Sequence, residues 1–195
     1  MYITDLKLEV GILDTGMLYT DGSIEDSSGY NNNATLNSTT ILNTSEGRYD
    51  FSTYFGAYNT PVATLNTPSI LSALTNCTIT YWAKYDTTKS LLLTGQTTSY
   101  YIMASNNNNY YHSNAGTITT YRDGVSGTYK CTANEWHFFA LTGVNLSTWT
   151  AMKINGYGSG WPLNGYISDL RIYAIALDAD AIRQLYEVGA KVDNK

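Results

Sequence analysis

Apolar and polar residues alternate in short segments along most of the chain. Residues 6–10 and 166–173 show the alternation most clearly, with a period of two. This period is typical of a strand that buries one face and exposes the other. Gly, Asn and Ser clusters separate the segments, and Asp123-Gly124 predicts a tight hairpin. Residues 1–170 therefore predict a series of short strands, as in a β-sandwich or barrel.

Two segments are more apolar than a half-buried strand. Residues 136–141 are the most apolar and predict a central strand. Residues 78–85 carry bulky side chains on both faces, so we expect one face to meet the core and the other to line a concave surface. Trp82 and Trp136 are expected on facing strands of the sandwich, with at least one in the core. Loss of the Trp136 ring is then expected to cost about 3–5 kcal/mol.

The only helix that the pattern predicts covers residues 179–188. Asp178 is a suitable N-cap, and Gly189 fits the position just after the last helical residue. A short tail over residues 190–195 follows. The apolar stripe of the helix consists of Ile182, Leu185 and Tyr186.

Charge is sparse and acidic, which limits the possible partners. Charged residues make up 14% of the chain, the net charge is -5, and Lys and Arg form no cluster. Phosphate binding needs concentrated positive charge, so nucleic acid and anionic membranes are disfavoured as partners. No apolar run approaches the ~18 residues of a membrane span, and no signal peptide is visible. We expect a soluble protein that either lacks an export signal or is a trimmed fragment.

The titratable residues follow no catalytic pattern. Retaining glycan hydrolysis needs two carboxyl groups about 5 Å apart. Between residues 51 and 168 the only acids are Asp86, Asp123 and Glu135, at no paired spacing. His137 lies in an apolar strand and is expected to be a hydrogen-bonded structural residue. The sequence therefore predicts that the protein is not an enzyme.

The two cysteines, Cys77 and Cys131, form no metal-binding or redox motif. Each lies in or beside a strand-like segment, where a small buried thiol is the ordinary role. Because no export signal is visible, both are expected to be reduced and unpaired.

Six segments stand in a recognisable order: residues 26–36, 48–51, 77–84, 135–142, 154–156 and 164–177. In that order they resemble the laminin-G-like domains, which share the jelly-roll fold of the concanavalin A-like lectins and glucanases. Residues 77–84, for example, are similar to the family pattern f-T-I-s-a-W-v-K. The resemblance implies an all-β jelly-roll sandwich of two antiparallel sheets with a short C-terminal helix, as one domain over residues 1–195. Residues 156–163 depart from the family, because a Gly-rich loop replaces a strand pair.

The resemblance also implies a structural Ca²⁺ ion, because many relatives hold one with carboxylate and backbone oxygens. The matching candidates here are Asp26 in a turn and Asp169 on the last strand. Both have simpler roles as well. Asp26 can cap a turn without a metal, and Asp169 can pair with Arg171 or a backbone amide.

Aromatic residues beside Asn-rich segments give the candidate binding site. A pyranose stacks its C–H face on a flat ring while its hydroxyls bond to amides and carboxylates. We expect such a site at one rim of the sandwich, built from residues 106–111 and 156–161. The candidate glycan-binding residues are Tyr110, Tyr111, His112, Tyr157 and Trp161. The same composition suits a protein-contact surface, and several of these rings could instead stack across strands.

Taken together, these features predict a non-catalytic, lectin-like module on a virion or extracellular surface, with carbohydrate as partner. Residues 185–195 resemble endings seen in phage and prophage structural proteins. The alternative is a structural or assembly domain whose sandwich packs against other virion proteins.

Overall fold

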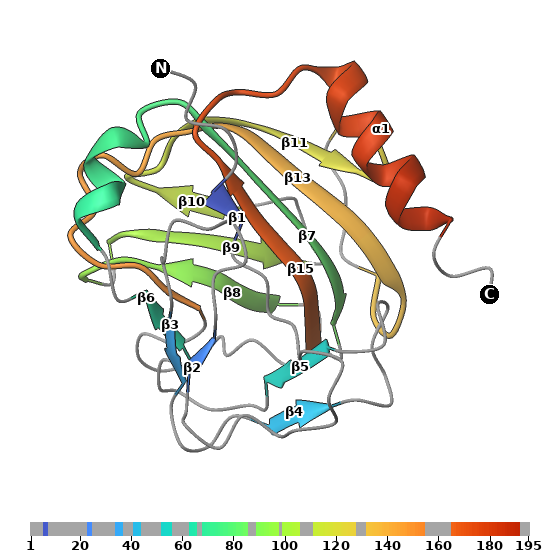
Figure 1. Cartoon of the computed structure of the whole chain (residues 1–195), viewed down its shortest axis with the longest axis horizontal. Coiled ribbons are helices and arrows are strands. Elements are labelled where there is room, and N and C mark those ends of the chain that lie inside the picture. The colour runs from blue at the N-terminus through green and yellow to red at the C-terminus, as the bar shows by residue number, and fades with distance from the viewer. Residues whose placement is uncertain are drawn as a thin grey trace.

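The computed structural model describes residues 6–7, 23–24, 34–36, 41–43, 52–55, 63–65, 68–85, 89–97, 99–105, 111–127, 132–154 and 165–191. These residues form two antiparallel β-sheets, a 3₁₀ helix η1 (Pro68–Ala73) and an α-helix α1 (Ala179–Ala190) (Figure 1). The predicted fold class, an all-β sandwich with a short C-terminal helix, is confirmed.

The eight-stranded sheet is built around three long neighbouring strands. Its spatial order is β12 (Val125–Ser126), β11 (Gly116–Arg122), β13 (Trp136–Val144), β7 (Cys77–Tyr85), β15 (Gly165–Tyr173), β5 (Ser52–Phe55) and β4 (Ile41–Asn43), with β1 (Leu6–Lys7) also paired to β15. The two segments that the sequence marks as most apolar are thus interior strands, β13 and β7.

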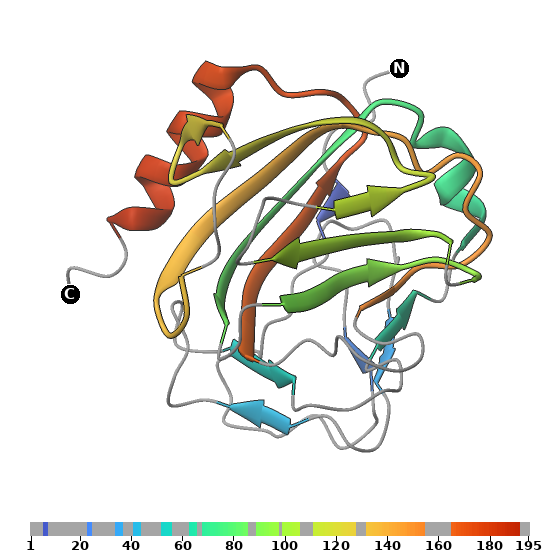
Figure 2. The ribbon, with the colours of Figure 1, turned by 180° about the vertical axis from the view of Figure 1, so that it is seen from behind.

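The seven-stranded sheet lies behind the first in Figure 1 and faces the viewer in Figure 2. Its spatial order is β10 (Tyr111–Ser113), β9 (Tyr101–Ser105), β8 (Lys89–Thr94), β14 (Lys153–Ile154), β6 (Ala63–Leu65), β3 (Ala34–Leu36) and β2 (Ser23–Ile24). Strand β10 is therefore an edge strand.

The main core fills the space between the two sheets. On β7 the alternate residues from Cys77 to Tyr85 belong to this core, as Leu93, Ile102 and Ile154 do from the other sheet. Burial of this apolar surface is the main favourable term in folding.

A second apolar cluster lies on the outer face of the eight-stranded sheet, beneath α1. It contains Trp82, Tyr121, Phe138, Ala140 and Ile182, with Leu185 and Tyr186 packed against it. The prediction that this face of β7 lines a concave surface is therefore wrong over Trp82, because the C-terminal helix covers it. This second layer explains why nearly every residue of β7 is buried.

Trp82 and Trp136 lie on neighbouring strands of one sheet rather than on facing strands. Trp82 pairs with Phe138, and Trp136 pairs with Lys84. Trp82 is buried, as predicted for at least one of the two, whereas Trp136 is half-buried.

Helix α1 begins as the sequence predicts. The Asp178 carboxylate accepts a hydrogen bond from the backbone N–H of Ala181 at 2.9 Å. Its end differs, because the helix continues through Gly189 to Ala190 and is capped at Lys191. Gly189 is buried inside the helix, so the absence of a side chain there serves packing rather than termination.

Cys77 is unpaired and fully buried, as predicted, and Cys131 lies outside the described residues. Burial raises the pKa of the Cys77 thiol from 9.0 to about 12. The unfolded chain therefore releases this proton at a lower pH than the folded chain. The contribution of Cys77 to stability is complete below pH 9 and is lost as the pH rises toward 12.

We expect the free energy of unfolding to fall more steeply above pH 9 in the wild type than in Cys77→Ala. The slope difference should approach about 1.4 kcal/mol per pH unit. Urea unfolding between pH 8 and 10.5 measures the two slopes. Because both proteins contain the same tyrosines, the contribution of the tyrosines drops out of the difference. Equal slopes in the two proteins contradict the assignment.

Candidate functional site

The loops of the sandwich gather at the two ends of its strands. Strand β13 joins the ends, because it starts at Trp136 beside the end of β7 and finishes at Val144 beside its start. The charged residues around the end of β11 and the start of β13 lie at the first of these ends.

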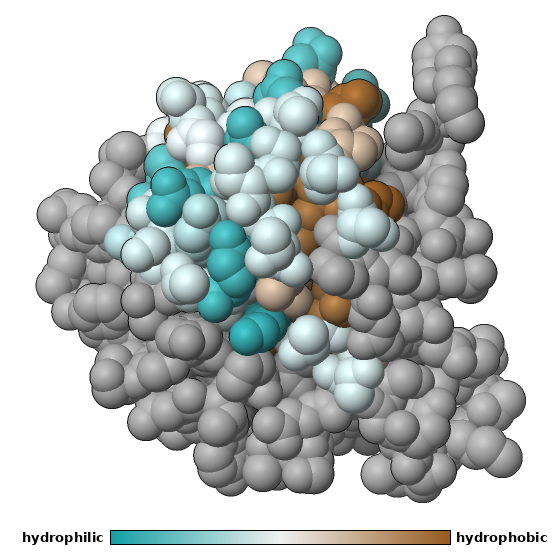
Figure 3. Space-filling model, turned by 90° about the vertical axis from the view of Figure 1, so that its left-hand side faces the viewer, coloured by the Kyte–Doolittle hydropathy of each residue, from teal (hydrophilic) through white to brown (hydrophobic). Residues whose placement is uncertain are grey.

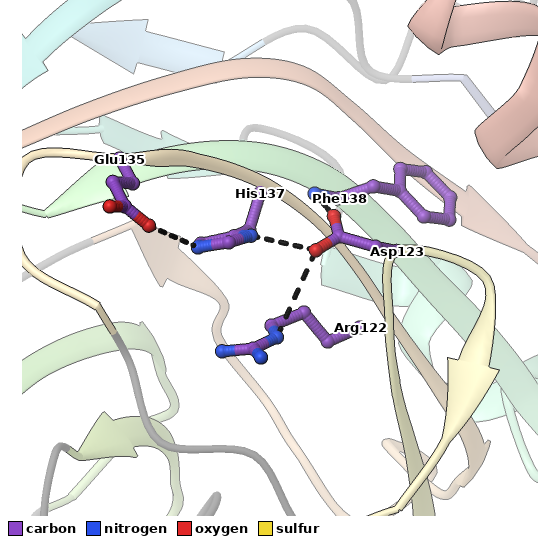
Figure 4. Close-up of polar contacts among 5 residues, drawn as sticks. All are labelled: Arg122, Asp123, Glu135, His137 and Phe138. Carbon is purple, nitrogen blue, oxygen red and sulfur yellow. Dashed lines mark hydrogen bonds and ion pairs between the residues drawn. The ribbon is translucent and has the colours of Figure 1, made fainter.

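Four charged or titratable side chains meet there: Arg122, Asp123, Glu135 and His137 (Figure 4). We call this group the Asp123–His137 cluster. His137 Nδ1 lies 2.7 Å from Asp123 Oδ2. Because an ionised carboxylate can only accept, Nδ1 is the protonated nitrogen of this contact.

Asp123 also continues the pairing of β11 with β13 beyond the last regular pair. Its backbone N–H donates to the Phe138 carbonyl at 2.9 Å, and the Phe138 N–H donates to Asp123 Oδ1 at 3.0 Å. The carboxylate thus takes the place of a backbone carbonyl. It can do so because Asp123 and Gly124 turn into the left-handed region, with φ of 52° and 80°, and form the predicted hairpin between β11 and β12.

The remaining contacts of the cluster are longer. His137 Nε2 is 3.5 Å from Glu135 Oε2, and Arg122 Nε is 3.8 Å from Asp123 Oδ2. The first pair meets the distance for an ion pair but not for a hydrogen bond, and among the described residues Nε2 makes no hydrogen bond. A His–Asp pair serves catalysis when a nucleophile lies on the free nitrogen. Here Glu135 occupies that side, so the geometry supports the predicted structural role of His137.

Loss of the Asp123 carboxylate should therefore loosen the β11–β12 hairpin. We expect Asp123→Ala to lower the free energy of unfolding by about 2–3 kcal/mol, from lost hydrogen bonds and from alanine in the left-handed region. Asp123→Asn keeps an acceptor for the Phe138 N–H and should lose less. Denaturant unfolding of both variants measures the difference, and an Ala variant as stable as the wild type contradicts the role.

The opposite face of β13 carries an aromatic group at the same end. Lys84 pairs with Trp136 on one side and with Tyr166 on the other. The Lys84 ammonium lies 5.5 Å from the Tyr166 ring centre, and the Trp136 and Tyr166 rings are 6.3 Å apart. All three side chains are half-buried. Contacts of this kind stabilise neighbouring strands.

The structure places two of the five candidate glycan residues. Tyr111 and His112 are consecutive on the edge strand β10, and His112 is exposed. Tyr110, Tyr157 and Trp161 lie outside the described residues. The proposed joining of the two loops into one rim site therefore stays a prediction.

Of the two candidate calcium ligands, Asp26 lies outside the described residues. Asp169 forms an ion pair with the side chain of Arg171. Asp169 accepts a hydrogen bond from Arg171 Nε at 2.6 Å. Burial lowers the pKa of Arg171, but the charge of Asp169 and hydrogen bonds to Asp169 and Tyr173 raise it more. Asp169 sits at a bulge in the pairing of β15 with β7, with φ of 52°. Pairing with Arg171 is the simpler role that the sequence analysis gave for Asp169. The calcium site stays a prediction.

The described residues contain no group of three metal-ligating side chains. Within the same residues, no helix combines the length and apolar character that crossing a membrane requires.

Sequence reasoning missed the Asp123–His137 cluster. Its partial signal is that Glu135 and His137 are two residues apart, which places them on one face of a strand. The missing information is the order of the strands, because only the pairing of β11 with β13 brings Asp123 to His137.

No protein-family model matches the sequence, and no curated protein matches it. Solved structures do match in fold. The binding domain of botulinum neurotoxin serotype D has a TM-score of 0.60 at 14% identity, with 95% of this chain and 52% of that chain covered. A Trypanosoma rangeli sialidase in complex with the inhibitor DANA has a TM-score of 0.55 at 10% identity, with 94% and 32% covered.

These likenesses support the sandwich fold alone, because the identities are low. The chain spans about half the length of the neurotoxin binding domains it resembles. Fold likeness does not transfer a ligand or a reaction.

Proposed function

We propose that this chain is a non-catalytic binding module that recognises glycans on a virion or extracellular surface. The observation that carries the proposal is the edge strand β10. It holds Tyr111 and the exposed His112, and in the sequence the Asn-rich residues 106–109 precede it by one residue. A sheet edge that carries aromatic side chains is well suited to hold a sugar ring.

Two further observations favour binding over catalysis. The Asp123 carboxylate accepts two hydrogen bonds that hold the β11–β12 hairpin, so its contacts are structural. Several structures of this fold are described as binding domains, although a sialidase shares the fold as well. One matching structure is described with the statement that cell entry of botulinum neurotoxin type C depends on interaction with two ganglioside molecules. Another is the binding domain of botulinum neurotoxin DC in complex with rat synaptotagmin II.

A glycan array compares the wild type with Tyr111→Ala/His112→Ala and with Trp161→Ala. The control is Gln184→Ala, an exposed position on α1. We expect saturable binding that both test variants weaken and the control does not, with no sugar released from the array. Absence of binding to any glycan contradicts the proposal, and release of a sugar contradicts the non-catalytic part.

A structural role in an assembly is the second candidate, and exposed apolar side chains favour it. Val125 on the edge strand β12 is 62% exposed, and Val188 on α1 is 67% exposed. Exposed edges and apolar side chains promote protein contacts. The resemblance of residues 185–195 to phage structural proteins suits this setting. Concentration-dependent association that Val125→Lys abolishes, together with an empty glycan array, supports assembly instead of lectin activity.

A further inference from the structure

At the end of the sandwich opposite the Asp123–His137 cluster, hydrogen bonds join four uncharged segments. They are residues 68–76, 95–100, 113–118 and 143–151, of which residue 98 lies outside the described residues. None of them contains Asp, Glu, Lys, Arg or His. We call this surface the charge-free rim. Figure 3 faces this end, and its described residues are mostly white or teal, so they are polar or close to neutral in hydropathy.

Hydrogen bonds between the segments hold the rim in one arrangement. The backbone N–H of Leu146 donates to Leu74, and that of Asn145 donates to Ala115, both at 2.8 Å. Asn114 links the 113–118 segment to residues 95–100, because its side-chain amide donates to the Ser99 carbonyl at 2.9 Å.

The side-chain amide of Gln96 holds the backbone of the 143–151 segment with both its nitrogen and its oxygen. Its Nε2 donates to the Thr148 carbonyl at 3.2 Å, and its Oε1 accepts from the Thr150 N–H at 3.0 Å. Between these two threonines, the buried Trp149 donates from its indole N–H to the Asn114 carbonyl at 2.6 Å. The backbone under the exposed side chains is thus positioned before any ligand arrives.

The exposed groups on this frame are hydroxyls and amides. The exposed polar residues of the rim include Ser72, Asn76, Thr97, Ser99, Asn114, Thr148 and Thr150. The amide oxygen of Asn114 can still accept a hydrogen bond, because the bond to Ser99 uses the amide nitrogen. Tyr100 is half-buried and packs edge-on against Trp149 with ring centres 6.0 Å apart, which adds an aromatic surface.

We propose that the charge-free rim binds an uncharged glycan. The proposal rests on the glycan-binding function above and adds a second surface and a ligand class. A phosphate, a nucleic acid or an acidic sugar needs Lys or Arg at the contact, and these are absent from the rim. A neutral sugar needs donors, acceptors and an aromatic face held in place, since fixed groups lose little entropy on binding.

The variant Thr148→Ala/Thr150→Ala tests the rim without disturbing its frame. Both residues are exposed, and their backbone contacts with Gln96 do not involve the hydroxyls. The matched control is Thr119→Ala/Thr132→Ala, two exposed threonines outside the rim. The ligand is the neutral oligosaccharide with the strongest signal on the array, titrated by calorimetry.

We expect binding about tenfold weaker in the rim variant, since each neutral hydrogen bond contributes roughly threefold. The melting temperature and the control variant should not change. Binding should also vary less than about twofold between 0.05 and 1 M NaCl, because no charge takes part. Neutral-glycan binding that the rim variant keeps and Tyr111→Ala/His112→Ala loses overturns the inference and leaves the proposed function standing. Binding of acidic glycans alone also overturns it, and binding of no glycan overturns both.

Discussion

Replacing Trp82 with alanine is expected to lower the free energy of unfolding by about 3–5 kcal/mol. Trp82 is 2% exposed and lies between the eight-stranded sheet and α1. Its ring centre is 5.3 Å from that of Phe138 and 5.9 Å from that of Tyr186 on the helix. Removing the ring leaves a cavity between two rigid elements that cannot close it fully.

Trp136→Ala is the matched control, because it removes the same side chain from a neighbouring strand. Trp136 is half-buried, so we expect a smaller loss of about 1–2 kcal/mol. The large loss that the sequence predicted at Trp136 therefore belongs at Trp82. Urea unfolding measures both variants. Hydrogen exchange adds a local readout, because only Trp82→Ala should speed exchange in residues 179–190. Equal losses of stability with unchanged exchange in the helix contradict the assignment of Trp82 to this layer.

The sequence predicted the strands well where a local signal exists. The period of two and the Asp123-Gly124 dipeptide place β15 and the β11–β12 hairpin, and Asp178 marks the start of α1. Each of these signals acts within a few residues, so it can be read without knowing the rest of the fold.

The errors arise where a distant element decides the outcome. An apolar outer face on β7 does not reveal whether solvent, ligand or helix covers it, and here α1 packs on Trp82. Gly189 looks like a helix stop, yet it is buried within the helix. The contact between Asp123 and His137 depends on strand order, and the flanking of Lys84 by Trp136 and Tyr166 depends on register.

The candidate site was predicted by composition more than by geometry. Tyr111 and His112 were predicted because aromatic residues stand beside an Asn-rich segment in the sequence. The structure places both on an edge strand. The charge-free rim carries few exposed aromatic rings, so the same reasoning passed over it. Its distinguishing feature is that uncharged segments distant in sequence come together.

Gly165→Ala is expected to lower the free energy of unfolding by about 3–5 kcal/mol, from strain and steric overlap together. Gly165 opens β15 with φ of 143°, and an added Cβ there would lie 2.2 Å from the Lys84 carbonyl oxygen. Both neighbouring groups are backbone, since the Tyr85 Cα would be 2.8 Å away. The start of β15 must therefore move away from β7.

Gly124→Ala separates the two causes of this loss. Gly124 also has a positive φ, of 80°, but the nearest atom to its added Cβ is the Tyr186 side chain at 3.2 Å. Strain without a backbone collision should cost about 1–2 kcal/mol. Denaturant unfolding compares the variants, and Tyr166 fluorescence or chemical shifts report whether its contact with Lys84 is lost only in Gly165→Ala. If the two substitutions cost the same, conformational strain alone explains Gly165, and the close approach of β15 to β7 contributes nothing.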